Sequence, residues 1–449
     1  MTRVLFVDDE PYILSGLKRM LHSQREWEMV FATSGNEALE LAERVPLDAI
    51  VSDMRMPGMD GVALLTEMRR RHPAVARLIL SGQTVQADAM RCLSVAHQSI
   101  AKPCQPADLV WAVERACNLQ GRLQSLELRA ALGRVDSLPS PPLVVLELKR
   151  VIERDDATLD DVDRVISTDP GMAAKVLQVV NSAFFGLARQ VSQVHEALAY
   201  LGLNLVHDIV VTTEIFRAAE DLSGLPSSLL ECLRAHANSA SSFAADLARG
   251  SKHRHQAVIA GLLHDIGWLV LASQMPERLK AVRAAAGEGR SLEEVELEVL
   301  GASHAELGAY LLSLWGLPPS VVEAVLHHHD ADSMPHDELD LPHLVRLADF
   351  LAAEHGTSLE VLEGKIDPPD EAYVARLGVA ALLEQARGGG EPSADARDGA
   401  PAADAGALHM TGHEGADGAA GAGTTVTDLP TPAEALAPTP TEAAPLGAF

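Results

Sequence analysis

The chain has 449 residues, enough for two or three domains that each bury a core. Its 36 Lys and Arg face 63 Asp and Glu, giving a formal net charge of −27 without any basic run, and this argues against a nucleic-acid surface. No apolar stretch approaches the roughly 20 residues of a membrane span. The four cysteines lack CxxC spacing and indicate free thiols in a reducing compartment. We therefore expect a soluble, cytoplasmic, multidomain protein with no membrane or nucleic-acid partner.

Short apolar segments alternate with amphipathic helical patterns over residues 1–118. The predicted strands are Val4–Val7, Glu28–Ala32, Ala49–Ser52, Leu78–Ser81 and Gln98–Ala101. The clearest predicted helices between them are Ser15–His22, Gly35–Arg44 and Gly61–Arg71. Units of this length and order predict an α/β fold with a doubly wound, five-stranded parallel sheet. The functional site of such a sheet lies at the carboxyl ends of its strands.

A helical stripe continues past this α/β domain. Apolar residues recur at steps of three or four from Leu109 to Ala130, which predicts one helix running across the domain edge. Two interpretations remain open. The stripe belongs either to a signalling helix or short coiled coil, which would allow a homodimer, or to a helix that packs on its own domain. The Pro-rich stretch 137–142 then marks a boundary. We assign residues 119–137 to this linker helix.

The rest of the chain divides into a helical domain and a tail. Residues 138–386 show helical patterns throughout, with Gly and Pro mainly between them, and predict an all-α domain. Residues 387–449 are rich in Ala, Gly, Pro, Thr and acids. Such a segment has too little bulky apolar surface to offset its ordering entropy. We expect a disordered tail that carries no site.

Acidic and polar residues stand at the ends of the predicted strands. Asp8 and Asp9 follow the first strand, and Asp53 follows the third. Three carboxylates at adjacent strand ends repel one another without a cation, and an all-oxygen ligand set suits Mg²⁺. Ser81 and Lys102 end the fourth and fifth strands, where a hydroxyl and an ammonium group are placed to hold phosphoryl oxygens.

These residues belong to longer motifs that resemble a two-component receiver domain over residues 1–118. The motifs are Val7-Asp8-Asp9-Glu10, the segment Asp53–Gly61 with its Met56-Pro57-Gly58, Ser81-Gly82 and Lys102-Pro103. The family often has an aromatic switch residue three positions before the lysine. This chain has Ser99 there, so the route from receiver to output is left open.

The resemblance implies a role for each residue of this set. Asp53 would be the catalytic nucleophile that becomes an aspartyl phosphate. Mg²⁺ would be held by Asp8, Asp9, Asp53 and the backbone carbonyl of Arg55. Ser81 and Lys102 would sense the bound phosphate.

Histidines and aspartates recur along the predicted helices of the second domain. The candidates are His236, His264, Asp265, His304, His328 and Asp349. Imidazole and carboxylate groups from several helices together make a site for a divalent transition metal, which would activate water against a phosphodiester. With 18 histidines in the chain, any single one is more often a core or surface residue than a ligand.

The order of these residues resembles the HD phosphohydrolase superfamily, most closely in the string Ala260–Gly267. The resemblance implies that His236, His264, Asp265 and Asp349 match its core metal ligands, and that His304 and His328 match ligands added in its cyclic di-GMP-hydrolysing HD-GYP branch. The chain departs from that branch at Trp268, where a lysine is expected, and lacks a Gly-Tyr-Pro element after His329. Both departures count against cyclic di-GMP hydrolysis.

Four upstream segments resemble a different relative, the HDOD family. They are Ile166–Met172, Lys175–Leu177, Asn181–Gly186 and Ala197–Gly202. HDOD domains are helical output domains of bacterial signalling proteins and are generally regarded as non-hydrolytic. The resemblance covers roughly residues 135–345. In physical terms Asp169-Pro170 suits a helix start, Asn181 suits a bend whose backbone groups it satisfies, and Gly186 suits a helix end.

The two resemblances together imply a response regulator of a phosphorelay. Its receiver would be phosphorylated by a sensor histidine kinase and would relay the signal to a non-catalytic HDOD domain that binds a protein target or small ligand. The alternative is a metal-dependent HD-type phosphohydrolase that acts on a nucleotide or cyclic dinucleotide under receiver control. The sequence leaves it open whether the second domain is an enzyme.

Overall fold

The computed structural model of the protein describes most of the first 388 residues. The described residues are 1–81, 92, 95–119, 122–123, 125–135, 138–140, 147–148, 150–152, 154, 156–181, 187, 189–202, 217–218, 227–286, 292–334, 338–357 and 368–388. All of them belong to one unit that spans Met1–Gly399. Contacts between its α/β and helical parts are therefore contacts within a single body.

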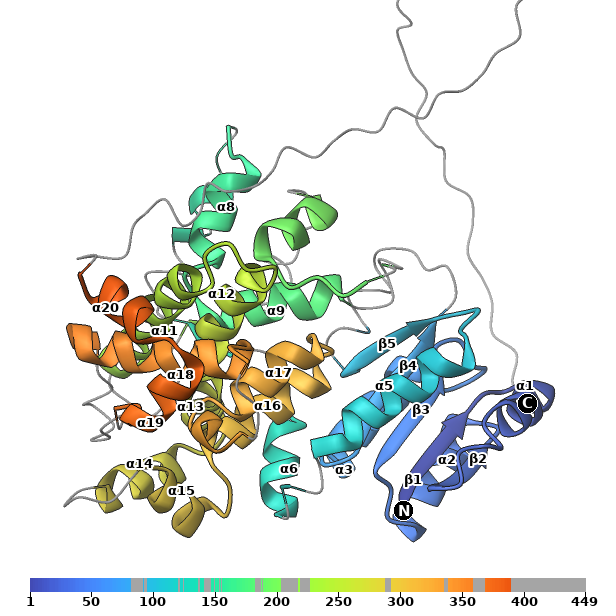
Figure 1. The fold of residues 1–449 in the computed structure, drawn as a ribbon. Helices are drawn as coiled ribbons and strands as arrows, with labels where there is room; N and C mark the ends of the chain where they lie inside the picture. Colours follow the sequence, from blue (N-terminus) through green and yellow to red (C-terminus); the bar gives the residue numbers. More distant parts are fainter. Residues whose placement is uncertain are drawn as a thin grey trace, which may run out of the picture. The chain divides into compact units, whose positions relative to one another are not determined.

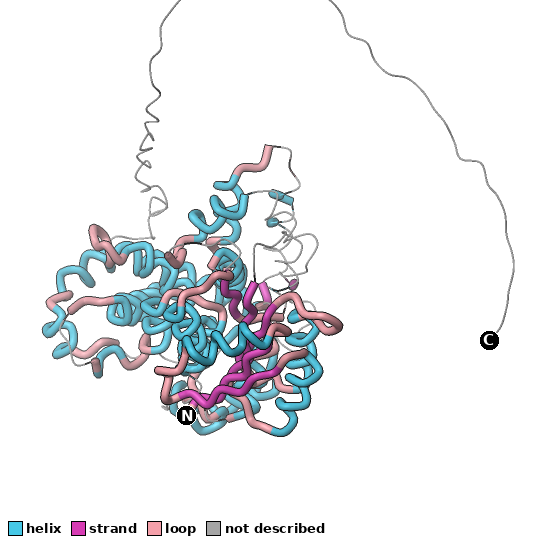
Figure 2. Tube along the Cα trace, turned by 90° about the vertical axis from the view of Figure 1, so that its right-hand side faces the viewer, coloured by secondary structure: helices cyan, strands magenta, loops and turns pink. Residues whose placement is uncertain are grey.

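A five-stranded parallel sheet forms the N-terminal part, as predicted (Figure 2). Its strands are β1 (Thr2–Val7), β2 (Trp27–Ala32), β3 (Ala49–Asp53), β4 (Ala76–Ser81) and β5 (Gln98–Ala101). They lie in the order β2-β1-β3-β4-β5, so the chain changes direction across the sheet at the neighbouring strands β1 and β3. In doubly wound sheets this switch point is where ligands bind. The register aligns the carboxyl ends of the strands, with Val7 opposite Ser52 and Ser81 opposite Ala101.

The helices that alternate with these strands along the chain pack on the sheet. They are α1 (Pro11–Met20), α2 (Gly35–Arg44), α3 (Gly61–Arg71) and α5 (Pro106–Asn118). The predicted ranges for α2 and α3 are confirmed because both begin at side-chain caps, with Ser34 accepting from the backbone N–H of Glu37 and Asp60 from that of Ala63. Helix α1 begins four residues before its predicted start, since Pro11 is well suited to the first helical position.

The prediction of one continuous helix from α5 into the linker is wrong. Helix α5 ends at Asn118, and a separate helix α6 (Leu126–Leu132) begins where the Ser125 side chain accepts a hydrogen bond from the N–H of Leu128. The apolar spacing could not reveal this break, because Ser125 competes as a new helix cap. Leu128 and Leu132 are each 1% exposed, so the stripe is buried within the chain. This supports the interpretation of a linker that packs on its own body.

The C-terminal part is helical, as predicted, and is shown in green to orange in Figure 1. Its helices are α8 (Leu159–Ile166), α9 (Pro170–Val180), α11 (Ser227–Leu247), α12 (Arg254–Leu263), α13 (Ile266–Gln274), α14 (Pro276–Ala285), α15 (Leu292–Leu300), α16 (His304–Leu314), α17 (Pro319–Leu326), α18 (Leu341–Ala352), α19 (Glu371–Leu377) and α20 (Ala380–Gly388), with the short turns η4 (Ala331–Ser333) and η5 (Ala353–Thr357). The exception is a pair of two-residue strands, β6 (Pro139–Ser140) and β7 (Arg217–Ala218).

The scaffold roles predicted for two polar residues are confirmed. The Asp169 carboxylate caps α9 by accepting from the N–H of Met172 at 2.8 Å, and Pro170 is the first helical residue. The Asn181 side chain bonds both backbone groups of Val191, at 2.8 and 2.7 Å. Gly186 lies outside the described residues.

Two apolar cores flank the sheet. The smaller one lies under α2 and α3 and includes Leu5, Ile50 and Leu64. The larger one begins on the other face with Phe6 and the α5 residue Val113, and continues without a break through α6 into the helical domain. One face of the sheet therefore shares its core with the helical domain.

One stretch of the described chain, Arg254–Gln274, is long and apolar enough to cross a membrane by length and composition. It has a mean hydropathy of 1.4, and 83% of it is buried inside the protein. It is also interrupted, because α12 ends at Leu263 and α13 begins at Ile266. These are the properties of core helices in a folded domain.

The tail should be dispensable for folding. Helix α20 extends the ordered chain to Gly388, and residues 389–449 of the predicted disordered tail lie outside the described residues. Removing residues 390–449 is expected to change the melting temperature by no more than about 2 °C, since every buried residue of the described chain is kept. Scanning calorimetry of the full and shortened chains measures this change in melting temperature.

As a control, a chain ending at residue 370 loses the buried side chains of Tyr373, Val379 and Leu383. It should melt about 10 °C lower or more, and equal losses for both truncations would contradict the prediction.

Candidate functional site

Three of the predicted residues meet at the switch point of the sheet. Asp8 follows β1, Asp53 ends β3, and Lys102 follows β5. The Lys102 Nζ lies 3.0 Å from Asp8 Oδ2 and forms a second, shorter ion pair with Asp53 Oδ1. Asp8 is only 2% exposed, whereas Asp53 and Lys102 are partly exposed. The ammonium group thus lies between two carboxylates at the mouth of the site.

Backbone and polar groups complete this pocket. The N–H of Glu10 donates to Asp8 Oδ1 at 3.0 Å, and the N–H of Arg55 donates to Asp53 Oδ2 at 2.9 Å. Partial burial acts to lower the pKa of Lys102, but its bonds to Asp53 and Asp8 outweigh burial and raise it, so the side chain stays charged. Ser81 is buried at the end of β4, and Asp9 is partly exposed next to Asp8. The structure therefore gathers all the predicted residues at one edge of the sheet.

Gly61, the first residue of α3, explains part of the long motif after Asp53. A Cβ at this position would lie 2.2 Å from the backbone oxygen of Asp53. Only glycine lets the start of α3 pack this closely on the strand end, which helps to hold Asp53 in place.

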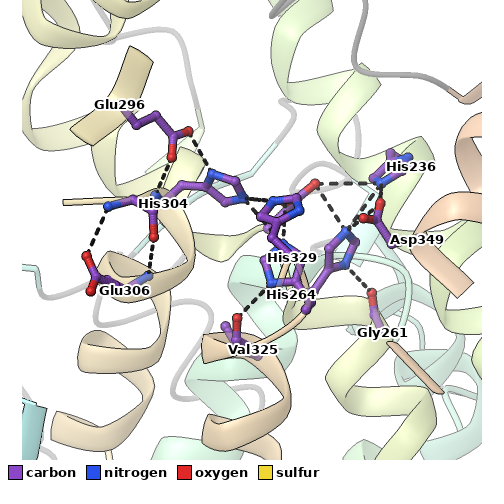
Figure 3. Close-up of polar contacts among 12 residues, drawn as sticks. His236, Gly261, His264, Glu296, His304, Glu306, Val325, His329 and Asp349 are labelled. Carbon is purple, nitrogen blue, oxygen red and sulfur yellow. Dashed lines mark hydrogen bonds and ion pairs between the residues drawn. The ribbon is translucent and has the colours of Figure 1, made fainter. Parts of the chain in front are cut away.

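The six candidate residues of the helical domain form a second cluster (Figure 3). They come from the middle of α11, the turn between α12 and α13, the start of α16, the turn after α17, and α18. They are His236, His264, Asp265, His304, His328 and Asp349, none more than 6% exposed. Their placement confirms that helices far apart in sequence bring these residues together.

Most rings of this cluster are held with Nε2 directed inward. The Nδ1 of His264 bonds the Gly261 carbonyl at 2.8 Å, and that of His328 bonds the Val325 carbonyl at 2.7 Å. A carbonyl accepts only from a protonated ring nitrogen, so in the neutral form of either ring the lone pair lies on Nε2. Metal-binding histidines commonly have this arrangement, in which an outer acceptor fixes the ring.

Asp265 lies between two groups of ligands. Its Oδ2 is 3.2 Å from His264 Nε2, and its Oδ1 is 3.2 Å from His304 Nε2. On the first side, His236 Nε2 is 2.9 Å from Asp349 Oδ1. Oδ2 of Asp349 is buried without a hydrogen-bond partner in the described part of the chain. Buried anionic oxygens of this kind are costly unless a cation compensates them.

Two residues of the cluster were not predicted. His329 Nε2 lies 3.0 Å from His304 Nε2, so His304, His328 and His329 form a second triad. Glu296 on α15 is fully buried, and its carboxylate accepts from His304 Nδ1 at 2.7 Å. His328 was predicted as a ligand within the run His327–His329, but the sequence could not show which of these rings turn inward. The His327 ring does not, because its Nδ1 pairs with Asp330 at 2.8 Å.

The charges of the cluster depend on burial and on these carboxylates. Burial opposes protonation of His264, but Asp265 and Asp349 outweigh it and hold the pKa of His264 well above its ordinary value. Burial opposes protonation of His304 as well, yet Glu296 and Asp265 raise its pKa to about 10. A divalent cation at these Nε2 atoms would replace the protons and neutralise the same acids.

The residues of the cluster fit a divalent metal. Imidazole nitrogens and carboxylate oxygens are the usual donors for zinc, iron, nickel or cobalt. Groups of three candidate ligand atoms within 4.8 Å of one another occur on both sides of Asp265. Each of these groups supplies three donor atoms for one divalent ion.

The surroundings of the cluster are closed. Trp268 is 1% exposed, and its indole stacks on the His304 ring with centroids 4.7 Å apart. Gly267 allows α13 to approach α16, since a Cβ there would lie 2.0 Å from the His304 carbonyl oxygen. The cavity beside Asp265, between α11 and α13, has a volume of about 10 Å³, room for one water molecule. Among the described residues, this cavity offers no space for a nucleotide.

Comparison with known proteins assigns both domains. The family model described as the response regulator receiver domain matches residues 4–114, and the HDOD domain model matches residues 138–331. An uncharacterised protein of Treponema pallidum is 29% identical over 241 residues, 52% of this chain and 46% of that protein. The hydrogenase transcriptional regulatory protein HoxA of Cupriavidus necator is 33% identical over 174 residues, 36% of each chain. The chain thus spans less than half the length of these two relatives.

The chain is also similar to a solved structure. The crystal structure of the MmoQ response regulator from Methylococcus capsulatus covers 56% of this chain and 97% of its own, at 20% identity and a TM-score of 0.45. Receiver domains generally bind Mg²⁺ and HD-type domains generally bind metals, in agreement with the two clusters of ligands. With a receiver domain matched at residues 4–114 and an HDOD domain matched at residues 138–331, the chain has the receiver-HDOD architecture of a response regulator.

Proposed function

We propose that the protein is switched by phosphoryl transfer to Asp53. The Asp53 Oδ attacks the phosphorus of the donor, and the bond from phosphorus to the donor breaks. Mg²⁺, held by Asp8, Asp9, Asp53 and the Arg55 carbonyl, supplies charge neutralisation when bound. Ser81 and Lys102 then bind the transferred phosphoryl oxygens.

The ion pairs of Lys102 carry this proposal. Its Nζ already bridges Asp8 and Asp53, so a phosphoryl group on Asp53 offers new anionic oxygens to a cation that is in place. In our proposal the lysine exchanges one of these carboxylates for the phosphoryl oxygens. That exchange of partners moves the end of β5 and gives the receiver two conformations whose populations depend on phosphorylation.

Its partners follow from these two domains. The phosphodonor is a sensor histidine kinase, the usual donor of receiver domains. The HDOD domain, which we place at residues 138–386, binds a protein target or a small ligand rather than nucleic acid, since the chain carries a net charge of −27. Phosphoryl transfer from a kinase to a soluble response regulator supports a cytoplasmic location.

The His/Asp cluster serves this output domain as a metal site that is not catalytic. His236, His264, Asp265 and Asp349 would hold one divalent ion, and His304, His328 and His329 would hold a second. Buried sites without an open position are typical of structural metals. The ions fix the packing of the helices that supply these residues.

Hydrogen exchange of the intact protein tests the regulatory proposal. Adding a small phosphodonor and Mg²⁺ should change amide protection in the HDOD domain of the wild type, and should change nothing in Asp53→Asn. Mass-spectrometric peptides report each domain separately. Identical changes in both proteins, or a change confined to the receiver, would refute a phosphorylation-driven output.

The alternative function, a metal-dependent phosphohydrolase, is favoured by one observation: the HD-type ligand set is complete and buried. It would need a substrate channel to the metal-held water, and a cation to stabilise the phosphodiester in the transition state. The 10 Å³ cavity and the neutral Trp268 provide neither. We therefore place this function second.

Cyclic di-GMP should not be hydrolysed even when metal is bound. The indole of Trp268 replaces the expected cation and cannot stabilise developing charge on phosphate. Losing one such interaction typically costs about 3–4 kcal/mol, or roughly a hundred- to a thousandfold in rate. Protein loaded with Mn²⁺ or Fe²⁺ should show no turnover above a His264→Ala control, measured by chromatography of the nucleotide products. Metal-dependent turnover that disappears in the control would establish the alternative.

A further inference from the structure

We propose that α16 couples phosphorylation of the receiver to metal binding in the His/Asp cluster. One end of this helix supplies His304 to the cluster, and the other end is bonded to β5 and α5 of the receiver. The inference rests on the proposed function, in that Asp53 is phosphorylated and the cluster binds metal. It adds a route between the two sites and a reciprocal effect of each on the other.

The first end of α16 is firmly fixed in the cluster. Glu296 accepts from both His304 Nδ1 and the His304 backbone N–H, at 2.7 and 2.8 Å. A capping box between Ser303 and Glu306 holds the same turn. As Figure 3 shows, the His304 ring points from this turn toward His329 and His264. Any displacement of the helix therefore moves a metal ligand.

The other end of α16 is bonded to the receiver. The Gln98 side chain donates from Nε2 to the Ser313 carbonyl at 3.1 Å, and Ser313 Oγ donates to the Arg115 carbonyl on α5 at 2.7 Å. Ser313 is 4% exposed, and its bond to Arg115 is buried while the bond from Gln98 is partly buried. One residue of α16 is thus held by two elements of the receiver.

Strand β5 connects this contact to the phosphorylation site. Gln98 is its first residue, and Lys102 directly follows its last, Ala101. Within the described ranges it is an edge strand, paired with β4 alone. When Lys102 exchanges a carboxylate for a phosphoryl group, the four-residue edge strand β5 shifts with it. Because Gln98 belongs to β5 and is bonded to Ser313, this shift moves the Ser313 end of α16.

The length and packing of α16 suit such coupling. Helix α16 has 11 residues, so it transmits a displacement over about 16 Å without bending. Its sides pack in the core that runs from the sheet into the helical domain. The guanidinium of Arg115, beside the Ser313 contact, is buried without a hydrogen-bond partner in the described chain and lies over the Trp111 ring, 4.7 Å from its centroid. A buried cation of this kind raises the free energy of this arrangement, which favours exchange with a second one.

Metal titration of the full chain in two receiver states tests the proposal. The probe is Co²⁺, followed by its visible absorption, with Mg²⁺ in large excess to occupy the receiver. Beryllofluoride serves as the phosphoryl analogue on Asp53. The wild type should change its Co²⁺ affinity by about fivefold or more when beryllofluoride is added, and Co²⁺ should change the beryllofluoride affinity by the same factor.

Two variants and one matched control locate the route. Gln98→Ala and Ser313→Ala should each reduce the change in Co²⁺ affinity to less than about twofold while the cluster still binds Co²⁺. Gln190→Ala is the control, because its Nε2 donates to the Gly316 carbonyl at 2.9 Å from within the HDOD domain. That variant removes a similar hydrogen bond from the same end of α16 and should keep the full effect.

The outcomes separate this inference from the function on which it rests. Beryllofluoride and Co²⁺ stoichiometries, measured first, show whether each site binds at all. If both sites fill and the wild-type affinities do not depend on each other, the coupling is refuted and the proposed function stands. If Gln98→Ala keeps the full effect, or Gln190→Ala loses it equally, the route through Gln98 is refuted.

Discussion

Replacing Asp53 with Asn should abolish phosphorylation of the protein. Asp53 is the partly exposed carboxylate at the end of β3, with Oδ1 paired to Lys102 and Oδ2 accepting from the Arg55 N–H. An amide keeps the shape but provides no anionic oxygen to attack phosphorus, and it weakens the Mg²⁺ site. Incubation with a small phosphodonor and Mg²⁺, followed by intact-protein mass spectrometry, should show one phosphoryl group on the wild type and none on Asp53→Asn.

A matched control distinguishes the nucleophile from a nearby acid. Asp60 caps α3 through its bond to the Ala63 N–H at 2.7 Å, and Asn is an equally good cap, so Asp60→Asn should still accept phosphate. Lys102→Ala should also accept phosphate but fail to alter hydrogen exchange in the HDOD domain, because Lys102 binds the product rather than attacking. An acid-stable label that remains on Asp53→Asn would disprove the assignment.

The double variant His264→Ala with Asp265→Ala should lose the metal of the HDOD domain. These residues supply an inward Nε2 and the carboxylate shared by both halves of the cluster. A ligand at a hundred times its dissociation constant stabilises the folded state by about 2.7 kcal/mol. For a domain of this size, that corresponds to a rise in melting temperature of roughly 5–10 °C. Adding Zn²⁺ or Co²⁺ to metal-free wild type should produce this rise, and the double variant should show none.

His327 provides the control for this experiment. It is a neighbour of the ligand His328, but its ring pairs with Asp330 outside the cluster. His327→Ala should therefore bind as much metal as the wild type, measured by inductively coupled plasma mass spectrometry on gel-filtered protein. His329→Ala should weaken binding, since its Nε2 faces His304. Equal metal content in the wild type and the double variant would show that the cluster is a polar core without ions.

The receiver could be predicted almost completely from the sequence. Its strands are continuous apolar runs because a parallel sheet is covered on both faces, and an acid or polar residue stands where each functional strand ends. The aligned carboxyl ends of the strands then bring Asp8, Asp53 and Lys102 together without further information. Local caps such as Ser34 and Asp60 placed the helices between them.

The helical domain shows what only the tertiary structure decided. Spacing marked His264-Asp265 and His304 as candidates, but helix packing determines which rings point inward, and this added His329 and Glu296 and excluded His327. The break between α5 and α6 was likewise hidden in an unbroken apolar stripe. A local pattern records which face of a helix is buried, whereas the partners of that face come from residues far along the chain. The contact of Gln98 with Ser313, 215 positions apart, is of this second kind, and no local pattern could have shown it.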